Sequence, residues 1–135
     1  MSERIPRKIV LAADDSILRA SYARDLRAAG HEVWEAEDGG QALALVRARA
    51  PGLLLIDRWL PTMNGLEVLE RLKSVTEAVG LTVVILSNDI EADARLEGSA
   101  LGVADWWRKD LSAVELCGRV EQVMKAAHPS FERGG

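Results

Sequence analysis

The chain contains few residues that could form disulfides, histidine clusters or membrane-spanning segments. It has one cysteine, Cys117, and two histidines among 135 residues, so it offers no paired cysteines and no histidine cluster. No unbroken apolar stretch approaches the roughly 20 residues that cross a bilayer. No apolar signal segment precedes the first apolar run. We therefore expect a soluble, cytoplasmic protein with a structural thiol and no membrane contact.

Basic residues are not in excess either. The chain has 17 Lys and Arg against 21 Asp and Glu, a net charge of −4. A protein that binds nucleic acid by neutralising phosphates needs a face rich in Lys and Arg, and none stands out in this sequence. Direct contact with nucleic acid is therefore not expected.

Short apolar runs alternate with segments of helical spacing, in a chain of one-domain size. The runs predict strands at Ile9–Ala13, His31–Ala36, Leu53–Ile56, Thr82–Leu86 and Val103–Trp107. The spacing predicts helices from Asp15 or Ser16 to Gly30, from Gly39 to Ala50, across Leu66–Leu72, over about Ile90–Ala100, and from Ser112 to Ala127 behind a Ser112/Glu115 capping box. Five such βα units predict an α/β fold, a doubly wound, flavodoxin-like parallel sheet with helices on both faces.

Four of the apolar runs end in residues that can take part in phosphate chemistry. Asp14 and Asp15 follow the first run, Asp57 the third, Ser87 the fourth and Lys109 the fifth. The carboxyl ends of parallel strands share one edge of the sheet, where open α/β sheets bind their ligands. Such an edge would hold three carboxylates, a hydroxyl and an ammonium, without a glycine-rich phosphate loop. This set favours binding of a hard divalent cation and transfer of a phosphoryl group to an aspartate.

The two adjacent aspartates have a structural alternative. Two close carboxylates repel each other unless a cation lies between them, and Mg²⁺ takes oxygen ligands while keeping several waters. Alternatively, Asp15 caps the following helix and Asp14 is merely solvated. Taken alone, Asp14 and Asp15 favour the structural alternative. Taken together with Asp57, they favour a metal site.

The other three residues could act directly on the phosphoryl group. A carboxylate at Asp57, on the floor of a cleft, can attack a phosphoryl donor and form an acyl phosphate. The Ser87 hydroxyl can hydrogen-bond a phosphoryl oxygen, and the Lys109 ammonium can pair with one. Singly, such residues are more often caps, turn formers or solvated charges. It is their common position at one edge of the sheet that indicates phosphoryl chemistry.

These segments resemble the receiver domain of two-component response regulators, from Lys8 to about Ala127. The matching segments are Ala13–Ser16, Ala36–Leu43, Asp57–Gly65, Ser87 after an apolar strand, and Gly102–Lys109. The resemblance implies a receiver domain at residues 1–127, followed by a C-terminal tail or linker stump at 128–135. The resemblance is to a single-domain regulator similar to those of chemotaxis, and the alternative that the chain is part of a longer protein with an output domain stays open.

The resemblance further implies a role for each site residue. Asp57 would be the phosphoacceptor, with Asp14 and Asp15 as the acidic pair that holds Mg²⁺. The backbone carbonyl of Trp59 would supply a further ligand to the metal.

Ser87 and Lys109 would hold the phosphoryl group. Trp106 occupies the aromatic switch position, where inward movement of Ser87 would let its ring rotate inward and reshape a protein-binding face.

Partners follow from the same resemblance. The phosphoryl donor would be a phosphohistidine on a histidine kinase or a histidine phosphotransfer protein, and the recipient of the signal would be a downstream protein effector. Homodimerisation through the last helices is a further expectation. The protein would catalyse its own phosphorylation and dephosphorylation, with no turnover of an external substrate.

Two departures from the family pattern lead to structural expectations. Asp110 stands where receiver domains usually have a proline, often after a cis peptide bond. A cis bond before a non-proline residue costs about 2.5–4 kcal/mol, so a trans bond is expected, and Asp110 adds a carboxylate that can compete for Lys109. Trp106 and Trp107 are adjacent and should lie on opposite faces of the sheet.

Two alternatives to a phosphorylation switch remain. A pseudo-receiver would keep the fold and act as a phosphorylation-independent protein-interaction module, which Mg²⁺-dependent phosphorylation would distinguish. A flavodoxin-shaped binder of small molecules is disfavoured, because the acidic pair after the first strand would repel a nucleotide phosphate.

Overall fold

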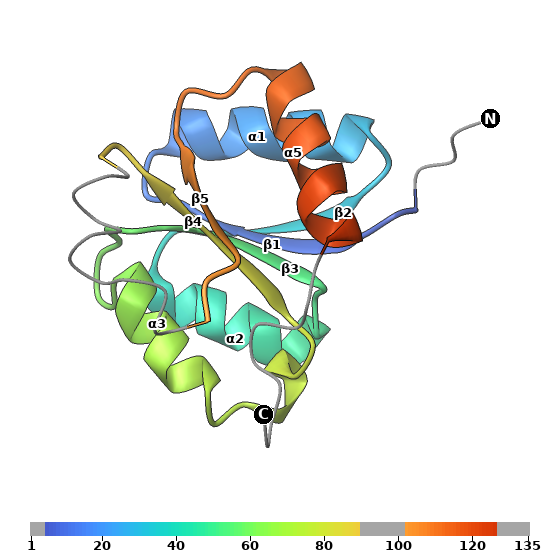
Figure 1. The fold of residues 1–135 in the computed structure, drawn as a ribbon. Helices are drawn as coiled ribbons and strands as arrows, with labels where there is room; N and C mark the ends of the chain where they lie inside the picture. The colour runs from blue at the N-terminus through green and yellow to red at the C-terminus, as the bar shows by residue number, and fades with distance from the viewer. Residues whose placement is uncertain (1–4, 90–101, 127–135) are drawn as a thin grey trace.

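The computed structural model describes residues 5–89 and 102–126 (Figure 1). Within them, one parallel sheet has the strand order β2-β1-β3-β4-β5, which confirms the predicted fold class. Its strands are β1 (Lys8–Ala12), β2 (Glu32–Ala36), β3 (Leu53–Asp57), β4 (Thr82–Ser87) and β5 (Asp105–Arg108). The helix expected over Ile90–Ala100 and the tail expected at 128–135 lie outside the described residues.

In the part of the chain that the structure describes, helices follow four of the strands. They are α1 (Ser16–Ala28), α2 (Gly39–Arg49), α3 (Gly65–Leu72) and α5 (Ala113–Lys125), with a short 3₁₀ helix η1 (Thr76–Ala78). In the ranges that the structure describes, none of them is both long enough and apolar enough to cross a bilayer.

The predicted capping box begins α5. The Ser112 Oγ accepts a hydrogen bond from the Glu115 backbone N–H at 3.1 Å, and the Glu115 carboxylate accepts one from the Ser112 N–H at 3.0 Å. These bonds satisfy N–H groups that lack partners within the helix. The hydrogen bond from the Ser112 backbone N–H, followed by one from its side chain, also holds the pKa of the Glu115 carboxyl below its ordinary value of 4.5. The start of α5, and with it the length of the preceding loop, is therefore set locally.

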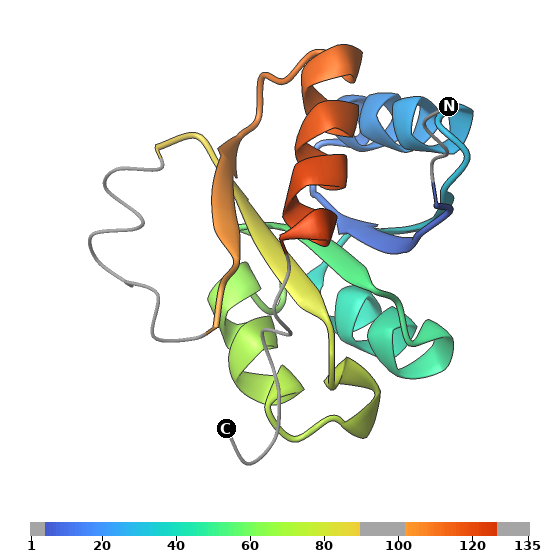
Figure 2. The same cartoon turned by 45° about the vertical axis from the view of Figure 1, so that its right-hand side comes forward.

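The strands separate two apolar layers because alternate residues point to opposite faces. In β1, Ile9 and Leu11 pack with α1 and α5, whereas Val10 and Ala12 pack with α2 and α3. Figures 1 and 2 show the same division, with α1 and α5 on one face of the sheet and α2 and α3 on the other. Both faces of the sheet are thus covered, and its ends are left for a site.

The two adjacent tryptophans of β5 lie on opposite faces, as predicted. Trp107 is 1% exposed within the α1/α5 layer, and Trp106 is partly buried against the α2/α3 layer. The strand starts two residues later than predicted, because its pairing with β4 begins at Asp105. The apolar character of Val103 and Ala104 does not reveal where that pairing begins.

Gly65 starts α3 where the chain passes close to the end of β3. A Cβ at Gly65 would lie 2.6 Å from the Asp57 carbonyl oxygen. We expect Gly65→Ala to lower the free energy of unfolding in urea by about 1–3 kcal/mol, the usual cost of overpacking. Gly118→Ala is the matched control, since nothing lies within 4 Å of the added Cβ. It should raise the free energy of unfolding by about 0.5–1 kcal/mol, and equal effects of both changes would contradict the close approach.

Candidate functional site

At the carboxyl edge of the sheet, Asp57 forms an ion pair with Lys109. The Lys109 Nζ lies 2.7 Å from Asp57 Oδ1 and 2.8 Å from Oδ2. The Asp57 side chain is 3% exposed and that of Lys109 is 20% exposed. A nearly buried carboxylate thus has its charge balanced by an ammonium that lies between both of its oxygens.

Strand order and side-chain direction explain why these two residues meet. β4 lies between β3 and β5, with Asp57 paired to Leu86 and Ser87 paired to Arg108. Asp57 alternates with Leu55, and Lys109 with Trp107, and both of these residues belong to the α1/α5 layer. The long lysine side chain therefore crosses the end of β4 on one face of the sheet.

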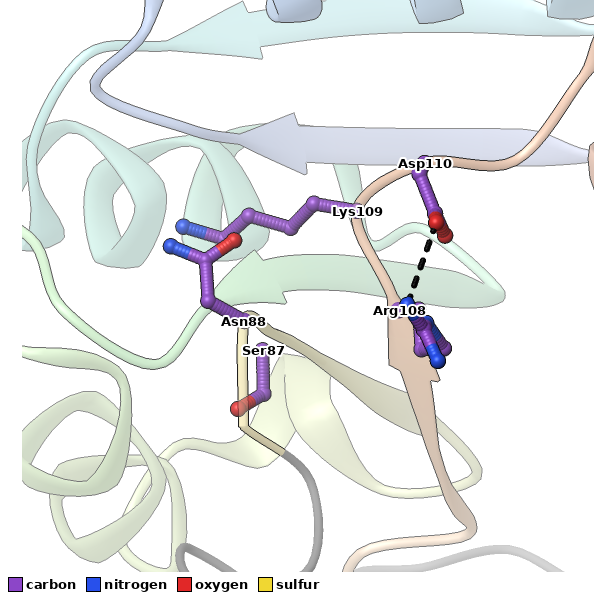
Figure 3. A pocket seen from close by; sticks show the side chains of 5 residues that line it. All are labelled: Ser87, Asn88, Arg108, Lys109 and Asp110. Atoms are coloured by element: carbon purple, nitrogen blue, oxygen red, sulfur yellow. Dashed lines mark hydrogen bonds and ion pairs between the residues drawn. The ribbon is translucent and has the colours of Figure 1, made fainter.

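Ser87 ends β4 and is 1% exposed. Its Oγ accepts a hydrogen bond from the Asp89 N–H at 3.0 Å, and in Figure 3 its hydroxyl points away from Lys109. Ser87 alternates with Val83 and Ile85, which belong to the α2/α3 layer. The structure therefore places Ser87 at the predicted edge but on the other face from the ion pair.

The two adjacent aspartates are exposed at the start of α1. Asp15 caps that helix, since its Oδ1 accepts from the N–H groups of Ile17 at 2.9 Å and Leu18 at 3.1 Å. The structural role that the sequence left open for Asp15 is thus present. Among residues 5–89 and 102–126, no three His, Cys, Asp or Glu side chains are arranged as a ready group of metal ligands. Asp14 and Asp15 therefore do not converge with Asp57 in this conformation.

The loop after Asp57 turns sharply towards α3. The Trp59 N–H donates to Asp57 Oδ1 at 3.2 Å, which fixes the carboxylate from its own loop. Thr62 has a φ of 69°, and the Met63 N–H donates to the Pro61 carbonyl at 2.7 Å, so the chain makes a γ-turn with positive φ. The Trp59 carbonyl, the expected metal ligand, lies within this short loop.

The ring of Trp59 is turned outwards. It is 61% exposed, and the Arg58 guanidinium stacks on it at 3.9 Å from the ring centre. Arg58 itself is 5% exposed. A second cation thus lies next to Asp57 along the chain, and the sequence interpretation did not single it out.

A small cavity of about 180 Å³ opens beside the ion pair. It is lined by Ser87, Asn88, Arg108, Lys109 and Asp110 (Figure 3). In this structure Arg108 pairs with Asp110 at 3.3 Å, whereas Lys109 pairs with Asp57. The expected trans peptide bond before Asp110 is confirmed, since the described residues contain no cis bond.

The ion pair should be asymmetric in its effect on stability. We expect Lys109→Met to lower the free energy of unfolding by about 1–3 kcal/mol, because it leaves a buried carboxylate without its cation. Asp57→Asn should cost less, because the partly exposed Lys109 ammonium can turn to water. Urea denaturation of both variants at neutral pH tests this, and a larger loss for Asp57→Asn would contradict it.

The comparisons with known proteins agree with the fold. The sequence profile of the response regulator receiver domain matches residues 9–121. The phosphate regulon transcriptional regulatory protein PhoB of Pseudomonas aeruginosa is 32% identical over 125 residues, which are 93% of this chain and 55% of PhoB. The response regulator MprA of Mycolicibacterium vanbaalenii is 29% identical over 130 residues, 96% of this chain and 55% of MprA. The chain thus spans about half the length of these relatives.

Solved structures show the same fold. The chemotaxis response regulator CheY4 of Vibrio cholerae superimposes with a TM-score of 0.81 at 24% identity, covering 88% of this chain and 99% of CheY4. The receiver domain of the Francisella response regulator 1452 superimposes with a TM-score of 0.77 at 27% identity, covering 89% of this chain and 98% of that receiver domain.

Fold and site together define a class, that of doubly wound α/β proteins with a buried aspartate and a lysine at the carboxyl edge of a parallel sheet. Within that class, the chain belongs to the response regulator receiver domain family of two-component systems.

Proposed function

We propose that the chain is a phosphorylation switch that accepts a phosphoryl group on Asp57 from a phosphohistidine of a sensor kinase or a phosphotransfer protein. A carboxylate oxygen of Asp57 forms the new P–O bond while the P–N bond to the donor imidazole breaks. The electron pair of that bond stays on the imidazole nitrogen, and Asp57 becomes an acyl phosphate. The observation that carries this proposal is the contact of Lys109 with both oxygens of a nearly buried carboxylate.

Chain residues hold the reacting groups in place. The Trp59 N–H and the Lys109 ammonium orient the carboxylate before transfer. After transfer, the same ammonium pairs with a phosphoryl oxygen. The Ser87 hydroxyl, released from the Asp89 N–H, hydrogen-bonds another phosphoryl oxygen.

The donor atoms suit Mg²⁺, because all of them are oxygens. Asp14, Asp15, Asp57 and the Trp59 carbonyl would hold the ion once the two exposed aspartates turn towards Asp57, and waters would complete its coordination. When bound, Mg²⁺ neutralises charge on the phosphoryl group during transfer. Because Asp14 and Asp15 are exposed, the ion can reach them directly from solvent.

The switch would use the other face of the sheet. Trp106 pairs with Ile85, and Ser87 lies two residues further along β4 on the same face. Movement of Ser87 towards the phosphoryl group would leave space near the partly buried Trp106 ring. The reshaped face would bind a downstream protein effector or a second copy of the chain through the last helices, in the cytoplasm.

The proposal is tested by incubating the protein with Mg²⁺ and acetyl phosphate and measuring intact mass and tryptophan fluorescence. We expect one added phosphoryl group and a fluorescence change, both lost without Mg²⁺ and both lost in Asp57→Asn. Trp106→Phe should still accept the phosphoryl group, with a smaller fluorescence change.

Asp25→Asn, on α1, is the matched control for Asp57→Asn and should be phosphorylated as the wild type is. No mass increase with acetyl phosphate or with a panel of phosphorylated histidine kinases would refute the proposal. In that case the chain would act as a phosphorylation-independent interaction module.

A further inference from the structure

The loop that carries Lys109 has an anchor that the proposed function does not use. Three residues, Lys109, Asp110 and Leu111, connect β5 to Ser112, the N-cap of α5. The Leu111 N–H donates a hydrogen bond of 3.1 Å to the hydroxyl oxygen of Tyr22 in α1. The loop is thus tied to a helix that precedes it by 89 positions.

The Tyr22 side chain is buried in apolar surroundings. Tyr22 is 3% exposed and belongs to the α1/α5 layer, with Leu111 packed against the same layer. Burial raises the pKa of this hydroxyl above its ordinary 10.0, and the hydrogen bond from Leu111 opposes that rise. Three nearby carboxylates raise it further, those of Asp110, Glu115 and Asp25. The phenol is therefore neutral at physiological pH, and its oxygen is positioned to accept from the loop.

The other contact within the loop is weak. Arg108 and Asp110 pair at 3.3 Å, but their side chains are 71% and 69% exposed. Exposed pairs contribute little because water and salt screen them. The bond to Tyr22 is partly buried and holds the residue two positions after Lys109, so it restrains the backbone from which the lysine side chain extends.

We propose that Tyr22 is a positioning residue, which keeps Lys109 on Asp57 by holding the Leu111 backbone. The inference rests on the proposed function, in which Lys109 orients Asp57 and then pairs with the phosphoryl group. Tyr22 touches neither group and acts only through the loop. Because the hydrogen bond to Tyr22 already orders the loop, the contact between Lys109 and Asp57 does not have to restrain a mobile backbone.

Tyr22→Phe tests this, because it removes the hydroxyl and keeps the ring. We expect the rate of phosphorylation by acetyl phosphate to fall by about three- to tenfold, the span that one neutral hydrogen bond supports. Hydrogen exchange of the Leu111 amide should accelerate, and NMR relaxation should show a more mobile Lys109 side chain.

A double-mutant cycle separates positioning from general destabilisation. In a Lys109→Ala background, Tyr22→Phe should no longer change the rate, because the residue that it positions is gone. Val120→Ala, in the same apolar layer, is the control for lost packing and should leave the mobility of Lys109 unchanged. An equal effect of Tyr22→Phe with and without Lys109 would overturn the inference.

Failure of the proposed function would be visible separately. If the wild type takes up no phosphoryl group, the phosphorylation switch is refuted, and the NMR measurements alone decide the role of Tyr22. Greater mobility of Lys109 in Tyr22→Phe would then support positioning. Unchanged mobility would overturn it.

Discussion

The ion pair between Asp57 and Lys109 is the interaction on which the site depends. A carboxylate that is 3% exposed would be costly to keep charged without a partner, and the ammonium that balances it comes from a residue 52 positions later in the chain. The pair can form only if β3, β4 and β5 lie side by side in parallel, with their carboxyl ends level. The sheet register therefore not only buries apolar residues but also brings the Asp57 carboxylate and the Lys109 ammonium together at the carboxyl edge.

This arrangement has a chemical consequence for phosphoryl transfer. The cation that stabilises the resting carboxylate is already where a transferred phosphoryl group would need one, so little rearrangement of charge is required. Asp14 and Asp15 differ from Asp57, because they are exposed and their charges are screened by water. Since Asp15 also caps α1, one carboxylate can serve both the fold and the edge.

The sequence allowed the parallel sheet to be predicted because short apolar runs alternate with segments of helical spacing, and the shared edge because four of those runs end in residues suited to phosphate chemistry. It also predicted the α5 capping box and the opposite faces of Trp106 and Trp107. It did not predict that Asp110 would pair with Arg108, because Arg108 and Lys109 both lie within two positions of Asp110 in the sequence. The hydrogen bond between Tyr22 and Leu111 was equally hidden, since helical spacing marks Tyr22 only as a core residue.

The two faces of the sheet divide the site between them. Asp57 and Lys109 lie in phase with the α1/α5 layer, whereas Ser87 and Trp106 lie in phase with the α2/α3 layer. Side chains on opposite faces of a strand cannot contact each other through the sheet, so the two halves can meet only past the strand ends. Under the proposed function, a phosphoryl group on Asp57 would enter that space and would link the ion pair on one face to the hydroxyl and tryptophan on the other.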